Sequence, residues 1–139
     1  MTSKILSVNG IKIAYQEKNA GNPSTVFFIH GNSNSSLLWR KQFEDPILAS
    51  YRLIAFDLPA HGESTAAPDP DKDYTGQRLG EIMAGAVSLL SGGHPYLLAG
   101  LSLGTNIVAE MLAYKLTPSG IILVSANVMG GAYTLDKAI

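Results

Sequence analysis

The chain has 139 residues, a formal net charge of −1 and no cysteine. The length predicts a single domain over residues 1–139, and the missing cysteine excludes a disulfide scaffold, a thiolate metal site and a cysteine nucleophile. The nearly neutral charge disfavours nucleic-acid binding. No stretch approaches the roughly 20 apolar residues of a membrane span, and no secretory signal is evident. We therefore expect a soluble, cytoplasmic protein.

The predicted elements begin with a hairpin and then alternate between strands and helices. Segments 4–8 and 11–16 flank Asn9-Gly10, which is the strongest short-range hairpin signal. Four continuous apolar runs follow, typical of strands buried on both faces of a parallel sheet; they are residues 26–29, 53–56, 96–99 and 121–124. The segments between them predict helices over residues 38–49, 75–91 and 103–116. This order predicts an α/β fold with a mostly parallel sheet and an N-terminal hairpin.

Polar and glycine-rich segments directly follow three of the predicted strands. They are residues 30–32, 57–64 and 100–104. In open α/β sheets, ligands bind beyond the carboxyl ends of the strands. We therefore expect the functional site at this edge of the sheet.

The third segment, Gly100-Leu101-Ser102-Leu103-Gly104, matches the pattern G-x-S-x-G. Between a strand and a helix, this pattern is typical of a sharp turn that strains the serine backbone and exposes its Oγ. Side chains at Gly100 and Gly104 would collide in such a turn. The alternative is a glycine-lined turn in which Ser102 only caps the following helix.

A serine nucleophile also needs N–H donors aimed at the developing oxyanion. The N–H of Leu103 is one candidate, because the helix dipole favours negative charge at a helix N-terminus. Gly31 lets the earlier loop turn close to the nucleophile and present the N–H of Asn32 as the second donor. The alternative for this loop is an ordinary strand-ending turn in which His30 is a buried, hydrogen-bonded histidine.

Taken together and in this order, residues 28–32, 56–64 and 100–104 resemble the α/β-hydrolase fold enzymes, from the hairpin to Val124. The resemblance implies a serine hydrolase that acts on an ester or related small-molecule acyl substrate through an acyl-enzyme, with an oxyanion hole and with no metal or organic cofactor. It departs at two positions where glycine is common in the family, Ala60 and Thr105. Residues 30–40 also resemble the loop of haloalkane dehalogenases, but those enzymes use an aspartate nucleophile, which Ser102 does not match.

The family orders its catalytic triad as Ser, then an acid, then His. All three histidines here, His30, His61 and His94, precede Ser102, and we expect His94 at the opposite edge of the sheet. Asp136 follows the last strand, where some members place the acid, but its surroundings do not match that motif. We therefore expect the base, and the acid, outside this chain, which resembles the N-terminal half of a hydrolase truncated after about its sixth strand and lacking the cap.

Such a truncation would leave one strand, made of the four apolar residues Ile121, Ile122, Leu123 and Val124, on an open edge of the sheet. An open apolar edge is a template for pairing. We expect it to hold the C-terminal half of the same enzyme or another copy of the chain. Two alternatives remain: a non-catalytic small-molecule-binding or assembly module, and an acyltransferase or perhydrolase.

Overall fold

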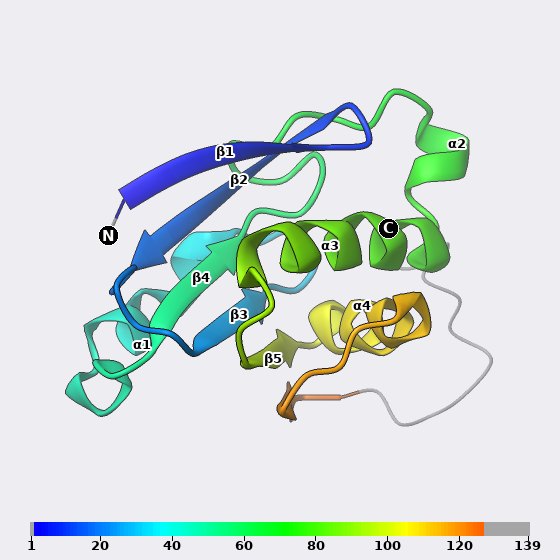
Figure 1. Cartoon of the computed structure of the whole chain (residues 1–139). Coiled ribbons are helices and arrows are strands. Elements are labelled where there is room, and N and C mark those ends of the chain that lie inside the picture. Colours follow the sequence, from blue (N-terminus) through cyan, green and yellow to red (C-terminus); the bar gives the residue numbers. More distant parts are fainter. Residues whose placement is uncertain (1, 127–139) are drawn as a thin grey trace.

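A computed structural model describes residues 2–126 and contains a six-stranded sheet in the order β1-β2-β4-β3-β5-β6 (Figure 1). The strands are β1 (Thr2–Val8), β2 (Ile11–Lys18), β3 (Thr25–Ile29), β4 (Arg52–Phe56), β5 (Tyr96–Leu101) and β6 (Gly120–Val124). β1 pairs with β2, and β2 with β4, in antiparallel fashion, whereas the other three pairings are parallel. The predicted α/β fold, with its N-terminal hairpin and mostly parallel sheet, is confirmed.

The helices connect the parallel strands. They are α1 (Arg40–Glu44), α2 (Pro70–Asp73), α3 (Gly76–Ser91) and α4 (Leu103–Met111), with 3-10 turns η1 (Ser36–Trp39), η2 (Pro46–Leu48) and η3 (Leu112–Tyr114). α3 follows its prediction closely: the Thr75 side chain accepts a hydrogen bond from the N–H of Arg78, and Gly92 ends the helix in the left-handed conformation. None of the helices described in residues 2–126 has the length and apolar character needed to cross a bilayer.

The predicted continuous helix over residues 38–49 is wrong. The segment is divided into η1, α1 and η2 because Asp45 has an extended backbone, which the following Pro46 favours. The Asp45 carboxylate then accepts a hydrogen bond from the N–H of Ile47 and starts a separate turn. The last predicted helix also ends early, since α4 stops at Met111 and tightens into η3.

Both faces of the central strands β3, β4 and β5 are buried, as their continuous apolar runs indicate, whereas the fourth run, in β6, is exposed. Successive side chains of a strand point to opposite faces, so Phe27 and Ile29 pack with the cluster that includes α3 and α4. Phe28 lies on the other face, where it contacts Trp39 and Phe43. This double burial fixes the carboxyl ends of the neighbouring strands β4, β3 and β5 side by side and thereby positions the loops that follow them.

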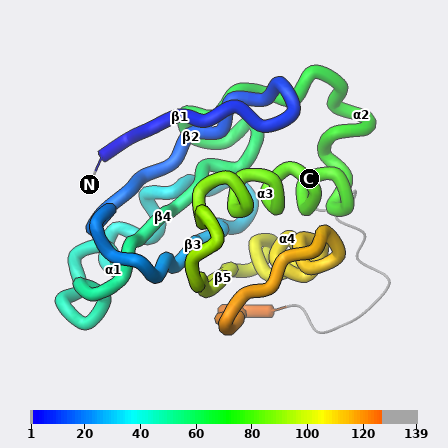
Figure 2. The backbone as a smooth tube through the Cα atoms, viewed as in Figure 1, coloured from blue at the N-terminus to red at the C-terminus, as the bar shows by residue number. Residues whose placement is uncertain are grey.

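The two outer strands of the described sheet are β1 and β6, which lie at opposite ends of the molecule (Figure 2). β6 has β5 as its neighbour in that sheet. Its four apolar side chains are each 42–50% exposed, at Ile121, Ile122, Leu123 and Val124. The predicted apolar edge is therefore present among the described residues.

Candidate active site

Ser102 lies at the apex of the turn between β5 and α4, with φ +52° and ψ −116°. Its N–H donates to the carbonyl oxygen of Val124 in β6, and its own carbonyl accepts from the N–H of Thr105. The residue is exposed, and its side chain makes no capping hydrogen bond to α4. The alternative that Ser102 only caps the helix is therefore contradicted, and the expected strained, exposed serine is what the turn contains.

The two glycines of the motif are required by backbone contacts. A Cβ on Gly100 would lie 2.6 Å from the carbonyl oxygen of Gly104. A Cβ on Gly104 would lie 2.2 Å from the carbonyl oxygen of Ile29, so this glycine is needed where α4 crosses the end of β3. The collisions expected from the sequence are present: that of Gly100 is within the turn, and that of Gly104 is with the neighbouring strand β3.

Thr105, a departure from the family pattern, stabilises the same turn. It is buried, and its Oγ1 donates a hydrogen bond of 2.6 Å to the carbonyl oxygen of Ser102. No role for this residue was expected from the sequence. The available signal was a hydroxyl residue three positions after the strained serine, because a threonine side chain in a helix often donates a hydrogen bond to the carbonyl three or four residues earlier.

The loop after β3 lies directly against this turn. A Cβ on Gly31 would lie 3.4 Å from the Cβ of Ser102 and 3.9 Å from the backbone nitrogen of Leu103. Asn32 follows on the exposed surface, and Leu103 is the first residue of α4. The first N–H groups of a helix have no acceptor within it. The structure thus brings together the segments that carry Ser102 and both expected oxyanion donors.

His30 is completely buried at the start of this loop. Its Nε2 accepts a hydrogen bond of 3.0 Å from the N–H of Leu58, and its Nδ1 lies 2.6 Å from the carbonyl oxygen of Gly31. Burial lowers the pKa of His30, against the opposing effect of the Gly31 carbonyl. A neutral, hydrogen-bonded histidine is the result, in agreement with the alternative interpretation of this residue.

The segment after β4 is organised by the buried Asp57. Its Oδ1 accepts from the N–H of Ser36 at 2.7 Å, and its Oδ2 accepts from the N–H of Glu63 at 2.9 Å. Ala60 adopts φ +63°, which explains why glycine suits this position. Asp57 was not among the site residues expected from the sequence, although an acid directly after a buried strand is a usable signal for a carboxylate that binds backbone N–H groups.

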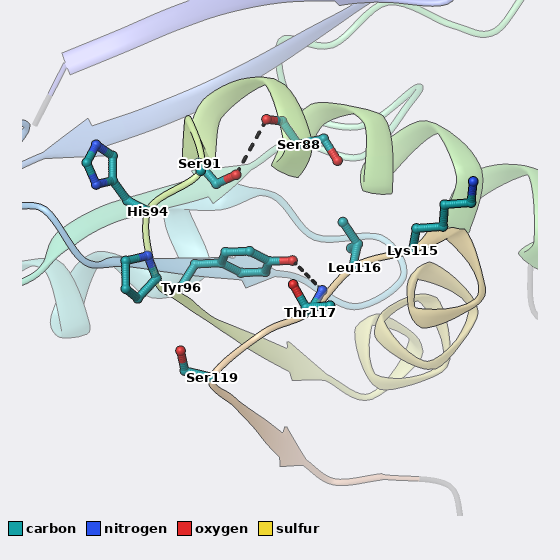
Figure 3. Close-up of a pocket in the computed structure, with 10 residues that line it drawn as sticks. Ser88, Ser91, His94, Tyr96, Lys115, Leu116, Thr117 and Ser119 are labelled. Atoms are coloured by element: carbon teal, nitrogen blue, oxygen red, sulfur yellow. Dashed lines mark hydrogen bonds between the residues drawn. The ribbon is translucent and has the colours of Figure 1, made fainter.

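None of the three histidines donates to or accepts from Ser102 within residues 2–126. His61 belongs to the loop after β4, where its ring centroid lies 5.1 Å from that of His30 and its Nδ1 lies 3.0 Å from the carbonyl oxygen of Pro59. His94 precedes β5 at the opposite edge, as expected. There it lines a pocket of about 500 Å³ that also contains Ser88, Ser119 and Lys115 (Figure 3).

Two further site components were considered from the sequence, a triad acid and a metal ion. Asp136, the candidate for the acid, lies outside the described residues. Within residues 2–126, no three His, Asp or Glu side chains converge in a way that could hold a metal ion.

A family model described as alpha/beta hydrolase fold matches residues 24–138. Among curated proteins, an epoxide hydrolase from Caballeronia sordidicola is 38% identical over 64 residues, which are 46% of this chain and 19% of that protein. A haloalkane dehalogenase from Agrobacterium fabrum is 39% identical over 66 residues, which are 48% of this chain and 20% of that protein.

Two solved structures extend the comparison over most of the chain. An N-acyl homoserine lactonase complexed with N-butanoyl homoserine superposes with a TM-score of 0.80 at 33% identity, covering 88% of this chain and 44% of the lactonase. An epoxide hydrolase from Vigna radiata has a TM-score of 0.81 at 24% identity, covering 92% and 39%, and shares the fold. The chain thus spans less than half the length of these structures and about a fifth of the curated relatives.

Proposed function

The chain belongs to the α/β hydrolase fold family, and on that premise we propose that it carries the nucleophile and oxyanion hole of a serine hydrolase for ester or related acyl substrates. The observation that carries the proposal is the backbone of Ser102: φ +52° in an exposed turn, with a side chain that caps nothing. Strained backbone persists where the surrounding structure enforces it, and such strain concentrates at functional sites.

The proposed reaction is acyl transfer in two steps. Ser102 Oγ attacks the substrate carbonyl and gives its proton to a histidine base, and the resulting oxyanion accepts hydrogen bonds from the N–H groups of Asn32 and Leu103. The histidine returns the proton to the leaving oxygen as the tetrahedral intermediate collapses, so a neutral alcohol departs and an ester remains on Ser102. Water then attacks this acyl-enzyme and releases the acid.

Serine at this position supports carbonyl chemistry over the chemistry named for two of the relatives. Haloalkane dehalogenases, which the loop over residues 30–40 resembles, use an aspartate nucleophile. The lactonase that superposes over 88% of this chain is named for a lactone, which is a cyclic ester. Lactones and simple esters are therefore the substrates to test first.

The general base must come from outside residues 2–126, because His30 and His61 are bonded elsewhere and His94 lies at the wrong edge. We propose that the C-terminal half of the same enzyme supplies it, and that this half, or another copy of the chain, covers the apolar edge of β6. Mass spectrometry of the purified protein under denaturing conditions, with light scattering in native buffer, tests this. A single 14.7 kDa species that is monomeric contradicts it.

The nucleophile is tested by substitution in the assembled protein. We expect Ser102→Ala to lower kcat/KM for ester and lactone hydrolysis by at least about 10³-fold, as loss of a serine nucleophile does elsewhere. The matched control is Ser88→Ala, an exposed serine in the pocket at the opposite edge, which we expect to keep full activity. Unchanged turnover in Ser102→Ala would remove Ser102 from the mechanism.

One observation favours a second candidate, a non-catalytic binding or assembly module. No described histidine reaches Ser102, so a chain that works without a further segment would bind acyl ligands without turning them over. Saturable binding of a lactone without hydrolysis would identify this function.

Acyltransferase or perhydrolase chemistry uses the same acyl-enzyme, and added alcohol or peroxide would then divert product from the free acid. A cytoplasmic location stays a prediction.

A further inference from the structure

The hydrogen bonds of His30 determine which ring nitrogen carries its proton. The backbone nitrogen of Leu58 can only donate, so Nε2, at 3.0 Å from it, must be the acceptor. The proton of the neutral ring is then on Nδ1. From there it is donated to the carbonyl oxygen of Gly31 at 2.6 Å.

This second bond fixes a particular peptide unit. The carbonyl of Gly31 and the N–H of Asn32 belong to the same planar, trans peptide and point in opposite directions. A bond that holds the Gly31 oxygen toward His30 therefore holds the Asn32 N–H away from it. Gly31 itself lies against Ser102 and Leu103, so the orientation of this peptide matters at the nucleophile.

The loop is anchored at both ends by neighbouring residues of a single segment. At its start His30 accepts from Leu58, and six residues later Ser36 donates its N–H to the carboxylate of Asp57. Both His30 and Asp57 are buried. The turn after β4 thus acts as a rigid support for the loop after β3.

We infer that His30 is a positioning residue, whose Nδ1–H holds the Gly31–Asn32 peptide so that the Asn32 N–H points to the oxyanion. The inference rests on the proposed serine-hydrolase function. The histidine transfers no proton in the reaction. Its contribution is to keep one oxyanion donor in a fixed direction before the charge develops.

Two substitutions separate the two hydrogen bonds of His30. His30→Asn places an amide N–H where Nδ1 lies and keeps the donor to Gly31, but it removes the acceptor for Leu58. His30→Gln places an amide oxygen where Nε2 lies and keeps that acceptor, but it removes the donor to Gly31. We expect His30→Gln to lower kcat about 100-fold, as loss of one oxyanion donor does, with KM changing less than about threefold.

We expect His30→Asn to retain kcat within about threefold while its urea midpoint falls, because the buried Leu58 N–H loses its acceptor. A purely structural role would make kcat follow stability in both variants. Equal losses of kcat in the two variants, or full activity in His30→Gln, would overturn the inference.

A spectroscopic test does not depend on the variants folding. Long-range ¹H–¹⁵N correlation spectra of the unsubstituted protein identify the tautomer of each histidine, and we expect His30 to be neutral with its proton on Nδ1. A proton on Nε2 would overturn the inference. Retained turnover in Ser102→Ala would instead refute the proposed function, whichever tautomer His30 has.

Discussion

The two ends of the parallel strands carry similar residues in very different settings. At the carboxyl end, His30, Asp57 and Thr105 are buried and hydrogen-bonded to backbone groups of the loops and turns that follow the strands. At the amino end, His94, Ser88 and other polar side chains lie exposed around an open pocket (Figure 3). Serine and histidine occur at both ends.

The difference teaches that residue type alone does not make a site. What separates the two ends is how far the backbone is constrained: at the carboxyl end, glycines allow main chains to touch and buried side chains lock the loops. Preorganised backbone N–H groups stabilise charge without reorganising during the reaction. Substitutions matched between the two ends can test this contrast.

The largest expected effect is that of Gly104→Ala. The new Cβ would lie 2.2 Å from the carbonyl oxygen of Ile29, and neither backbone can move without disturbing β3 or α4. We expect a loss of about 3 kcal/mol or more in the free energy of unfolding, at the upper end for overpacking. Urea unfolding measures it, with Gly21→Ala in the loop before β3 as the control, since a Cβ there meets nothing within 4 Å. Equal stability of the two variants would contradict the expected difference in backbone constraint between the two ends of the strands.

The next effect concerns the buried carboxylate. Asp57→Asn replaces one of two oxygens that accept backbone N–H groups with an NH₂ group, so one buried donor faces another donor. We expect a loss of about 2 kcal/mol. At the amino end, Asp45→Asn keeps its cap on Ile47 and should change stability by only a few tenths of a kcal/mol, because Asn caps as well as Asp. A comparable loss at Asp45 would count against the special rigidity of the carboxyl end.

A smaller effect, of opposite sign, is expected from relieving strain at Ser102. Ser102→Gly should raise the free energy of unfolding by about 1 kcal/mol, because glycine tolerates positive φ, while abolishing hydrolysis. Lys115→Gly, in the pocket at the other end, provides the comparison: its φ of +62° and ψ of 24° are ordinary left-handed values. We expect a smaller gain there. A larger gain at Lys115 would mean that the strain is not concentrated at the nucleophile.

The smallest effect is a dependence of stability on pH that separates the two ends. Because burial lowers the pKa of His30, the unfolded chain binds a proton before the folded one, so stability is lost as pH falls through about 6.5. Near the amino end of β4, burial raises the pKa of Glu17, but hydrogen bonds from Lys4 and Arg52 outweigh it and the pKa is lowered. That contribution is present above the ordinary value of 4.5 and is lost as pH falls below it.

Substitutions at His30 and Glu17 identify which residue causes each part of the pH dependence of stability. We expect His30→Asn to flatten the pH dependence of the urea midpoint around pH 6.5, and Glu17→Gln to flatten only the part below pH 4.5. A protein whose stability is constant from pH 7 to pH 5 would contradict the assignment of His30.

Much of the fold could be predicted from local patterns. Continuous apolar runs identified four strands, three of them buried and β6 exposed; Asn9-Gly10 identified the hairpin, and α3 follows its predicted range. The helix over residues 38–49 could not be read correctly from periodicity, because Asp45 and Pro46 interrupt it with a local cap that a hydrophobic pattern does not register. Glycine spacing around Ser102 was sufficient to predict the turn, although only the conflict at Gly100 is local and the one at Gly104 involves Ile29 of the distant strand β3.

What the sequence by itself determined is therefore the set of segments and the candidate nucleophile, through short-range sterics and hydrophobic periodicity. The hydrogen bond from Thr105 to Ser102 is local, but the roles of His30 and Asp57 were decided only by tertiary structure. Each depends on a backbone donor or acceptor whose position is set by sheet pairing, as when residues 30 and 58 meet across neighbouring strands. A hydrogen bond between distant segments has no signature in either segment alone, because its geometry exists only once both strands have docked.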